Sequence, residues 1–161
     1  MTTTNNIALF ITDVDGTLTD GGMYYSSQGE VMKKFNTKDA VGLRLLQEQG
    51  IIIAIITGED SDIVRARALK LKIQHVYCGI YDKLAILNSL CEQLNIDSQN
   101  VAYVGDDLND TEIMKAVGLS FAVGDAEKTI KEIAHINLER LGGYGAVREA
   151  ANYILEHHNE T

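Results

Sequence analysis

The chain has 161 residues, of which 45% are hydrophobic and 23% are charged, values typical of one soluble globular domain. Its formal net charge of -9, with no run of Lys or Arg, argues against a protein that binds nucleic acid or an anionic membrane. An anionic substrate would therefore need local cations or a metal ion at its binding site.

The first residues, 1–6, are polar and lack the basic and apolar stretches of a signal peptide. No later segment combines the length and hydrophobicity needed to span a bilayer. Cys78 and Cys91 show neither CxxC spacing nor a paired His, so we interpret them as small core residues in a reducing compartment. We expect a cytoplasmic protein with a single domain over residues 1–161.

Short apolar runs alternate with amphipathic segments along the chain, which is the pattern of a parallel sheet covered by helices on both faces. Strands are predicted at 7–11, 51–56, 74–78, 101–104 and 119–123, with a short run at 136–138. Apolar residues at helical spacing predict helices at 40–49, 61–71, 83–94, 110–117 and 146–157. The pattern predicts a doubly wound α/β fold, Rossmann-like in its organisation.

Two segments interrupt this alternation. Residues 23–35 contain two strand-like pieces around a Gly-containing turn, which predicts a projecting β-hairpin. Gly142, Gly143 and Gly145 precede the last predicted helix, and we interpret them as a flexible hinge.

Polar residues follow three of the predicted strands. Asp13 and Asp15 come after the first strand, Thr57 and Gly58 after the second, and the acidic run 106–110 after the fourth. In an open α/β sheet ligands bind at the carboxyl ends of the strands, so we expect these residues to converge. Crowded carboxylates repel one another unless a cation lies among them. The hard carboxylate oxygens of Asp, on short and rigid side chains, suit Mg²⁺. The expected ligands of Mg²⁺ are Asp13, Asp15 through its backbone carbonyl, and Asp106.

The same residues suggest phosphoryl transfer through a covalent intermediate. Asp13 would attack phosphorus, and Asp15 would protonate the leaving alcohol and then activate water. Thr57, with Gly58 beside it, would donate hydrogen bonds to the phosphate, and Lys83 would add positive charge. Any one of these aspartates is as well explained by a turn or a helix cap. Four such elements in this order are rarely combined by chance.

The motif DxDGT at residues 13–17, then Thr57-Gly58, Lys83 and GDDxND at residues 105–110, resembles the haloacid dehalogenase superfamily of phosphohydrolases over nearly the whole chain. The resemblance implies the roles given above. It also implies that Asp107 and Asp110 do not bind the metal themselves but orient the residues that do. The stretches 13–36 and 57–83 are too short for an inserted cap domain, so we expect a capless fold.

More narrowly, four segments resemble the family of 3-deoxy-D-manno-octulosonate 8-phosphate (KDO 8-phosphate) phosphatases and a close relative that acts on 2-keto-3-deoxynononate (KDN) 9-phosphate. These segments are 19–21, 34–39, 57–58 and 142–149. The resemblance implies a homotetramer in which neighbouring subunits complete each active site around a small sugar phosphate. It also implies that the sugar or its carboxylate contacts Asn36, Thr37, Lys38, Asp39, Ala40, Arg44, Arg67 and Arg148.

One departure concerns the choice of sugar. The octulosonate enzymes typically carry Arg after the Thr/Ser-Gly pair, whereas this chain has Glu59, with Lys70 further along. This combination, together with residues 33–37 and 81–84, looks more like the nine-carbon enzyme. A carboxylate at residue 59 would accept hydrogen bonds from sugar hydroxyls rather than pair with an acid group. KDO 8-phosphate, KDN 9-phosphate and N-acetylneuraminate 9-phosphate therefore all stay open as substrates.

Two other classes of function compete with a phosphatase. Receiver domains are also doubly wound, with clustered Asp and a Lys, but in them the acidic pair precedes the phosphorylated Asp, whereas here Asp13 comes first. Similar domains also serve as non-catalytic oligomerisation modules, which the complete set of Asp13, Asp15, Thr57, Lys83 and Asp106 argues against.

Overall fold

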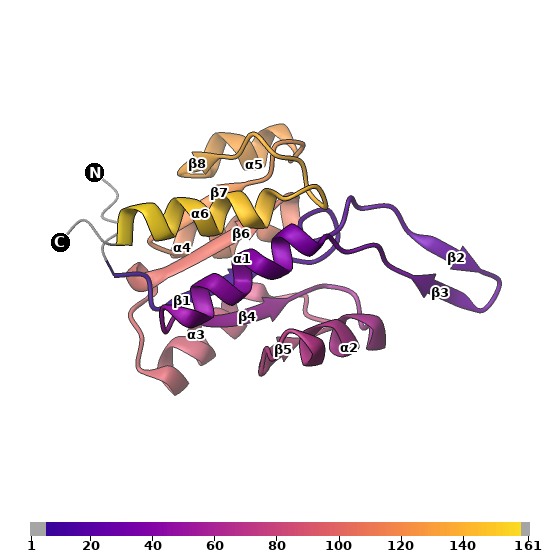
Figure 1. Cartoon of the computed structure of the whole chain (residues 1–161), viewed down its shortest axis with the longest axis horizontal. Helices are drawn as coiled ribbons and strands as arrows, with labels where there is room; N and C mark the ends of the chain where they lie inside the picture. The colour runs from indigo at the N-terminus through magenta and orange to yellow at the C-terminus, as the bar shows by residue number, and fades with distance from the viewer. Residues whose placement is uncertain (1–5, 159–161) are drawn as a thin grey trace.

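The computed structural model describes residues 6–158 and arranges them around a six-stranded sheet with helices on both faces (Figure 1). The strands are β1 (Leu9–Thr12), β4 (Ile52–Ile56), β5 (His75–Tyr77), β6 (Val101–Gly105), β7 (Leu119–Ala122) and β8 (Ile136–Asn137). Their order is β5-β4-β1-β6-β7-β8, and all neighbouring strands are parallel. The predicted doubly wound α/β fold is confirmed. The direction of winding reverses at β1, which places a crevice at its carboxyl end.

The helices are α1 (Thr37–Glu48), α2 (Asp62–Lys70), α3 (Lys83–Leu94), α4 (Thr111–Ala116), α5 (Lys128–Ile133) and α6 (Ala146–His158), with short 3₁₀ turns η1 (Ser98–Asn100) and η2 (Leu108–Asp110). Helices α1 and α6 lie side by side across one face of the sheet, and α3 and α4 lie behind it (Figure 1). Helix α5 was not predicted, because its six residues bury only Ile130 and are too short to show a period. Within the described residues, no helix has the length and apolar character to cross a membrane.

The central strands are buried on both faces. Phe10, Ile11, Ile55, Tyr103 and Phe121 are almost completely shielded from water. Because helices cover both sides, these strands read as continuous apolar runs rather than as alternating ones. The core therefore forms a rigid base for the loops at the carboxyl edge.

The segment after β1 forms an antiparallel hairpin of β2 (Tyr24–Ser26) and β3 (Gly29–Met32) that projects from the carboxyl edge of the sheet (Figure 1). This confirms the predicted hairpin. Its exposed apolar side chains are Met23, Tyr24, Tyr25, Val31 and Met32. An isolated two-stranded hairpin is marginally stable at best in water, so these side chains suit a contact with another surface. The described residues carry no separate cap domain on either connection, as expected.

The glycine-rich segment before α6 is not a free hinge in this structure. The backbone N–H of Gly142 donates to Asp125 Oδ1 at 2.9 Å, and that of Gly143 donates to the carbonyl of Thr17 at 3.1 Å. A β-carbon on Gly142 would stand 1.8 Å from the carbonyl oxygen of Gly16. These glycines therefore allow a close-packed connection against the loop that follows β1.

Candidate active site

A cleft of about 280 Å³ lies at the carboxyl edge of the sheet, where the loops after β1, β4 and β6 meet. The structure thus brings together residues that the sequence placed after three separate strands. The cleft is lined by Asp13, Asp15, Met23, Thr57, Gly58, Glu59, Asp106, Asp107 and Asn109. Its composition is strongly acidic, so an anionic substrate needs cationic compensation there.

Lys83 supplies one positive charge at the floor of the cleft. It is the first residue of α3, and its buried ammonium lies 3.0 Å from Asp13 Oδ1 and 2.7 Å from Asp110 Oδ1. Burial alone would lower the pKa of Lys83, but the carboxylates of Asp13 and Asp110 outweigh this and raise it. Lys83 is therefore a fixed cation beside the predicted nucleophile.

Asp110 holds both Lys83 and the loop after β6. Its Oδ1 accepts hydrogen bonds from Lys83 Nζ and the hydroxyl of Tyr103. Its Oδ2 accepts from the backbone N–H groups of Asp106 at 2.9 Å and Asp107 at 3.2 Å. Both oxygens are occupied, so Asp110 orients the site rather than offering a free ligand atom.

The carboxylates of Asp13 and Asp106 are crowded together. One oxygen from each, with one from Asp110, lies within a cluster whose members are all within 4.8 Å of one another. Burial, followed by the charge of Asp110, raises the pKa of Asp13 to about 6. Burial and the neighbouring Asp13 raise the pKa of Asp106 to about 9. This repulsion is the kind that a bound divalent cation removes, and hard oxygen ligands suit Mg²⁺.

Three further residues support the site and were not predicted to do so. The hydroxyl of Tyr103, in the buried middle of β6, accepts from Lys83 at 3.1 Å. Thr17 Oγ1 donates to Asp106 Oδ1 at 3.3 Å. Gly16 has φ +84° and lies against Asp106. The sequence did contain a signal for Tyr103, because it is a tyrosine within an apolar strand. A buried hydroxyl needs a hydrogen-bond partner, so a polar group was to be expected beside it.

Asp15 lies beside Asp13 and is bound from the base of the hairpin. Its Oδ1 is 2.6 Å from the ammonium of Lys33, which also lies 2.9 Å from Glu30 Oε2. Burial alone would lower the pKa of Lys33, but its bonds to these two carboxylates raise it. Lys33 therefore remains charged beside Asp15, a contact that the sequence did not predict.

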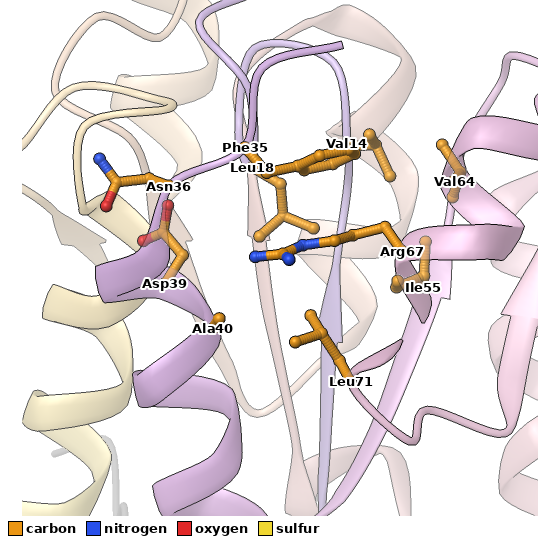
Figure 2. Close-up of a pocket in the computed structure, with 10 residues that line it drawn as sticks. All are labelled: Val14, Leu18, Phe35, Asn36, Asp39, Ala40, Ile55, Val64, Arg67 and Leu71. Atoms are coloured by element: carbon orange, nitrogen blue, oxygen red, sulfur yellow. The ribbon is translucent and has the colours of Figure 1, made fainter. Parts of the chain in front are cut away.

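Most of the predicted sugar contacts lie outside this cleft. Figure 2 shows a separate small cavity between α1 and α2, into which Arg67 extends from α2. This cavity shares no lining residue with the acidic cleft. It is lined by Asn36, Asp39, Ala40 and Arg67 together with Val14, Leu18, Phe35, Ile55, Val64 and Leu71. Arg44 and Lys70 line a neighbouring groove, and Thr37 and Lys38 are exposed at the start of α1. Of the predicted sugar contacts, Glu59 lines the cleft.

Asp39 and Arg148 join α1 to α6. Asp39 Oδ1 accepts from the backbone N–H of Arg148 at 2.9 Å, and Arg148 Nε donates to Asn152 Oδ1 at 3.0 Å. Burial raises the pKa of Asp39 to about 6, against the lowering effect of hydrogen bonds from the α6 backbone. Asn36 caps α1 by accepting from the N–H of Lys38 at 2.8 Å. Arg148 thus lies in the first turn of a packed helix, and its role as a sugar contact stays a prediction.

Comparison with known proteins identifies the family. Residues 73–140 match a model of haloacid dehalogenase-like hydrolases. The KDO 8-phosphate phosphatase of Salmonella typhi is 44% identical over 96% of this chain and 82% of its own length. That of Escherichia coli K12 is 45% identical over 93% of this chain and 80% of its own.

Solved structures agree. The KDO 8-phosphate phosphatase of Yersinia pestis superposes with a TM-score of 0.94 at 43% identity, covering 98% of this chain and 85% of that one. The cobalt-bound enzyme of Haemophilus influenzae superposes with a TM-score of 0.95 at 37% sequence identity, covering 98% of this chain and 92% of that one. The Moraxella catarrhalis enzyme, in complex with magnesium, phosphate and KDO, superposes with a TM-score of 0.93 at 39% sequence identity, covering 97% of this chain and 90% of that one. These likenesses weigh against a phosphoacceptor switch or a non-catalytic module. The chain belongs to the KDO 8-phosphate phosphatase family of haloacid dehalogenase-like hydrolases and is a phosphoric monoester hydrolase.

Proposed function

We propose that this protein removes the terminal phosphate of KDO 8-phosphate in a Mg²⁺-dependent reaction that passes through an aspartyl-phosphate on Asp13. The observation that carries the proposal is the buried Lys83–Asp13 pair beside Asp106, in a chain whose relatives are named for this substrate. A carboxylate can act as a covalent nucleophile for phosphoryl transfer when nearby charge is compensated.

The carboxylates of Asp13 and Asp106 and the backbone carbonyl of Asp15 would hold Mg²⁺. The raised pKa values of Asp13 and Asp106 support this assignment, because burial, and after it the charge of neighbouring carboxylates, disfavours their ionised forms when no cation is bound. When bound, Mg²⁺ would neutralise part of the charge on the phosphate and on these carboxylates. Relatives bind magnesium or cobalt in their solved structures, which is consistent with a divalent cation here.

The chain's own residues then divide the chemistry. Asp13 attacks phosphorus, and Lys83 offsets the negative charge that gathers beside it. Asp15 donates a proton to the departing alcohol oxygen and later takes one from the water that cleaves the aspartyl-phosphate. Thr57 and Gly58, which line the cleft, donate hydrogen bonds to phosphate oxygens.

Glu59 supports a second candidate substrate. It lines the acidic cleft at the position after the Thr57-Gly58 pair, where the octulosonate enzymes typically carry Arg. The combination of Glu59 and Lys70 resembles the enzyme that acts on KDN 9-phosphate, which favours this substrate or the other nine-carbon candidate, N-acetylneuraminate 9-phosphate. A carboxylate at residue 59 would accept hydrogen bonds from sugar hydroxyls. The names of the relatives favour KDO 8-phosphate, so we place the eight-carbon substrate first.

A homotetramer in which neighbouring subunits complete the active site follows from the same family resemblance. Two observations support it. The projecting hairpin exposes apolar side chains such as Tyr25 and Val31. Arg67 lines a cavity that shares no residue with the cleft of its own subunit, so as a sugar contact it would serve a neighbour. Light scattering after size-exclusion chromatography is expected to give a tetramer, and a fully active monomer would contradict the proposal.

The substrate experiment compares KDO 8-phosphate, KDN 9-phosphate and N-acetylneuraminate 9-phosphate by kcat/KM in the presence of Mg²⁺. The highest value is expected for KDO 8-phosphate, and a higher value for a nine-carbon substrate would overturn the assignment. Replacing Glu59 with Arg should shift the ratio further toward KDO 8-phosphate if residue 59 contacts the sugar.

The covalent step has its own test. Asp13→Asn should abolish turnover without unfolding the protein, and retention of more than a few per cent of the activity would rule out Asp13 as nucleophile. Asp15→Asn should slow hydrolysis of the intermediate, so that a phosphate adduct on Asp13 becomes visible by mass spectrometry.

A further inference from the structure

Lys33 is a buried cation at the base of a hairpin whose strands are otherwise mostly exposed. It directly follows β3 and is 9% exposed, whereas Val31 and Met32 are 56% and 53% exposed. Burying an ammonium group is costly unless it is paired and hydrogen-bonded. Its position beside Asp15 and Glu30 is therefore a specific feature of the fold rather than the ordinary solvated position of a lysine.

The two oxygens of Asp15 are in different situations. Oδ1 lies 2.6 Å from Lys33 Nζ. Oδ2 is buried and has no hydrogen-bond partner among the described residues. A buried acceptor without a partner is unfavourable, so such atoms often mark a catalytic role. The side chain of Asp15 is 24% exposed, so Lys33 holds one oxygen of a carboxyl group that still borders the cleft.

Glu30 fixes the ammonium of Lys33 from the other side. Glu30 Oε2 is 2.9 Å from Lys33 Nζ, and Glu30 Oε1 accepts from Ser61 Oγ at 3.5 Å. Ser61 is in turn the N-cap of α2, where its hydroxyl accepts from the N–H of Val64. The cation beside Asp15 is thus held by the hairpin and by the start of a helix on the main domain.

We propose that Lys33 is a positioning residue that binds Oδ1 of Asp15 and thereby holds the carboxyl group in the orientation needed for proton transfer. This rests on the proposed function, in which Asp15 is the general acid and base. A charge-assisted hydrogen bond to Oδ1 restricts rotation of the Asp15 carboxyl group and so holds both of its oxygens in one orientation.

The proton balance is the same in both half-reactions. As the bond from phosphorus to the substrate oxygen breaks and the bond to Asp13 forms, the proton on the Asp15 carboxyl group passes to the departing oxygen. In the second half, the Asp15 carboxylate takes a proton from the attacking water as the bond between phosphorus and Asp13 breaks. Lys33 keeps its own protons throughout.

The test uses two substrates that differ mainly in their need for a proton. Phenyl phosphate has a basic leaving group that requires protonation, whereas 2,4-dinitrophenyl phosphate releases a stable phenolate without one. The parameter is kcat/KM with Mg²⁺, because it covers the steps through cleavage of the leaving group. General acid catalysis typically contributes roughly 10²- to 10⁴-fold, so a misplaced acid should cost part of that factor.

We expect Lys33→Met to lower kcat/KM for phenyl phosphate about 10- to 100-fold and for 2,4-dinitrophenyl phosphate less than about threefold. Lys33→Arg should recover part of the loss, since it restores a cation at Oδ1. Lys34→Met is the matched control: Lys34 is adjacent and exposed, contacts Asp20 and Tyr144 rather than Asp15, and should leave both values unchanged.

An equal loss for both substrates, or no loss, would overturn the role of Lys33. If Lys33→Met fails to fold, Glu30→Gln tests the same idea, because it leaves Lys33 in place but weakens its second anchor. Asp15→Asn distinguishes a failure of the role given to Lys33 from a failure of the proposed function of Asp15. If Asp15→Asn lowers kcat/KM more for phenyl phosphate than for 2,4-dinitrophenyl phosphate, but the Lys33 and Glu30 variants do not, only the role of Lys33 is rejected. If Asp15→Asn lowers both values equally, the role of Asp15 as general acid is itself rejected.

Discussion

Gly16 lies directly against the carboxylate of Asp106: a β-carbon on residue 16 would stand 1.9 Å from Asp106 Oδ2. The backbone of Gly16 also has φ +84°, a conformation that side chains rarely allow. The DxDGT motif therefore requires glycine at residue 16 for two reasons. The backbone there has a positive φ, and a side chain would collide with Asp106, a proposed metal ligand.

The first prediction follows from this contact. Gly16→Ala should displace Asp106 and weaken Mg²⁺ binding by about 10- to 100-fold, the usual cost of disturbing a ligand's surroundings. Calorimetric titration with Mg²⁺ measures the effect. Gly50→Ala is the control, because Gly50 has a similar φ of +79° but no atom within 4 Å of the added carbon. Equal metal affinities in the two variants would contradict the prediction.

The second prediction concerns removal of the metal. Saturating Mg²⁺ should raise the melting temperature of the wild type, since a ligand at about 100 times its Kd stabilises the folded state by about 2.7 kcal/mol. Chelation with EDTA should reverse the shift, and Asp106→Asn should abolish it. Asp97→Asn should retain it, because Asp97 caps η1 before β6, away from the carboxyl edge. A full shift in Asp106→Asn would remove Asp106 from the ligand set.

The third prediction concerns Asp110, which binds Lys83 and two backbone N–H groups. Asp110→Asn should lower the free energy of unfolding by about 3 kcal/mol, because it breaks a buried ion pair. It should also lower kcat/KM about 10- to 100-fold through misplacement of Lys83 and the loop after β6. Tyr103→Phe removes one hydroxyl from the same group and should cost about 1 kcal/mol. Unchanged activity in Asp110→Asn would show that Asp13 alone holds Lys83.

The fourth prediction is a pH dependence of stability. Burial raises the pKa of Asp39 from an ordinary value of 3.8 to about 6. The folded state therefore binds a proton more readily than the unfolded state, and Asp39 costs stability as the pH rises from about 4 to about 6. Asp39→Asn has no such charge and should still accept the N–H of Arg148 through its amide oxygen.

Urea unfolding of the wild type and Asp39→Asn at several pH values measures this effect. The stability advantage of the variant should be near zero at pH 4 and grow to as much as about 3 kcal/mol above pH 6. Asp97→Asn, at an exposed cap, provides the comparison and should show no such growth. A pH-independent difference for Asp39→Asn would contradict the assignment.

The amino-acid sequence by itself determined the order of the elements and the main chemistry. Strand and helix periods are local properties, so the buried runs around Ile11 and Val104 could be predicted from the sequence. The residues after those runs meet at one edge of any parallel sheet, which is why Asp13, Asp15 and Asp106 were found together. Helix α5 escaped because a short helix with one buried residue has no readable period.

Only the tertiary structure decided which side chains touch. Lys33 reaches Asp15 from a hairpin, Tyr103 reaches Lys83 from a strand, and Asp39 binds the first turn of α6. The same is true of Arg67, which lies in a cavity separate from the cleft. These contacts join residues that are distant in the chain, and a local pattern carries no information about their distance. The sequence therefore located the proposed nucleophile and the proposed metal ligands, whereas the packing of hairpin, sheet and helices determined which groups hold them in place.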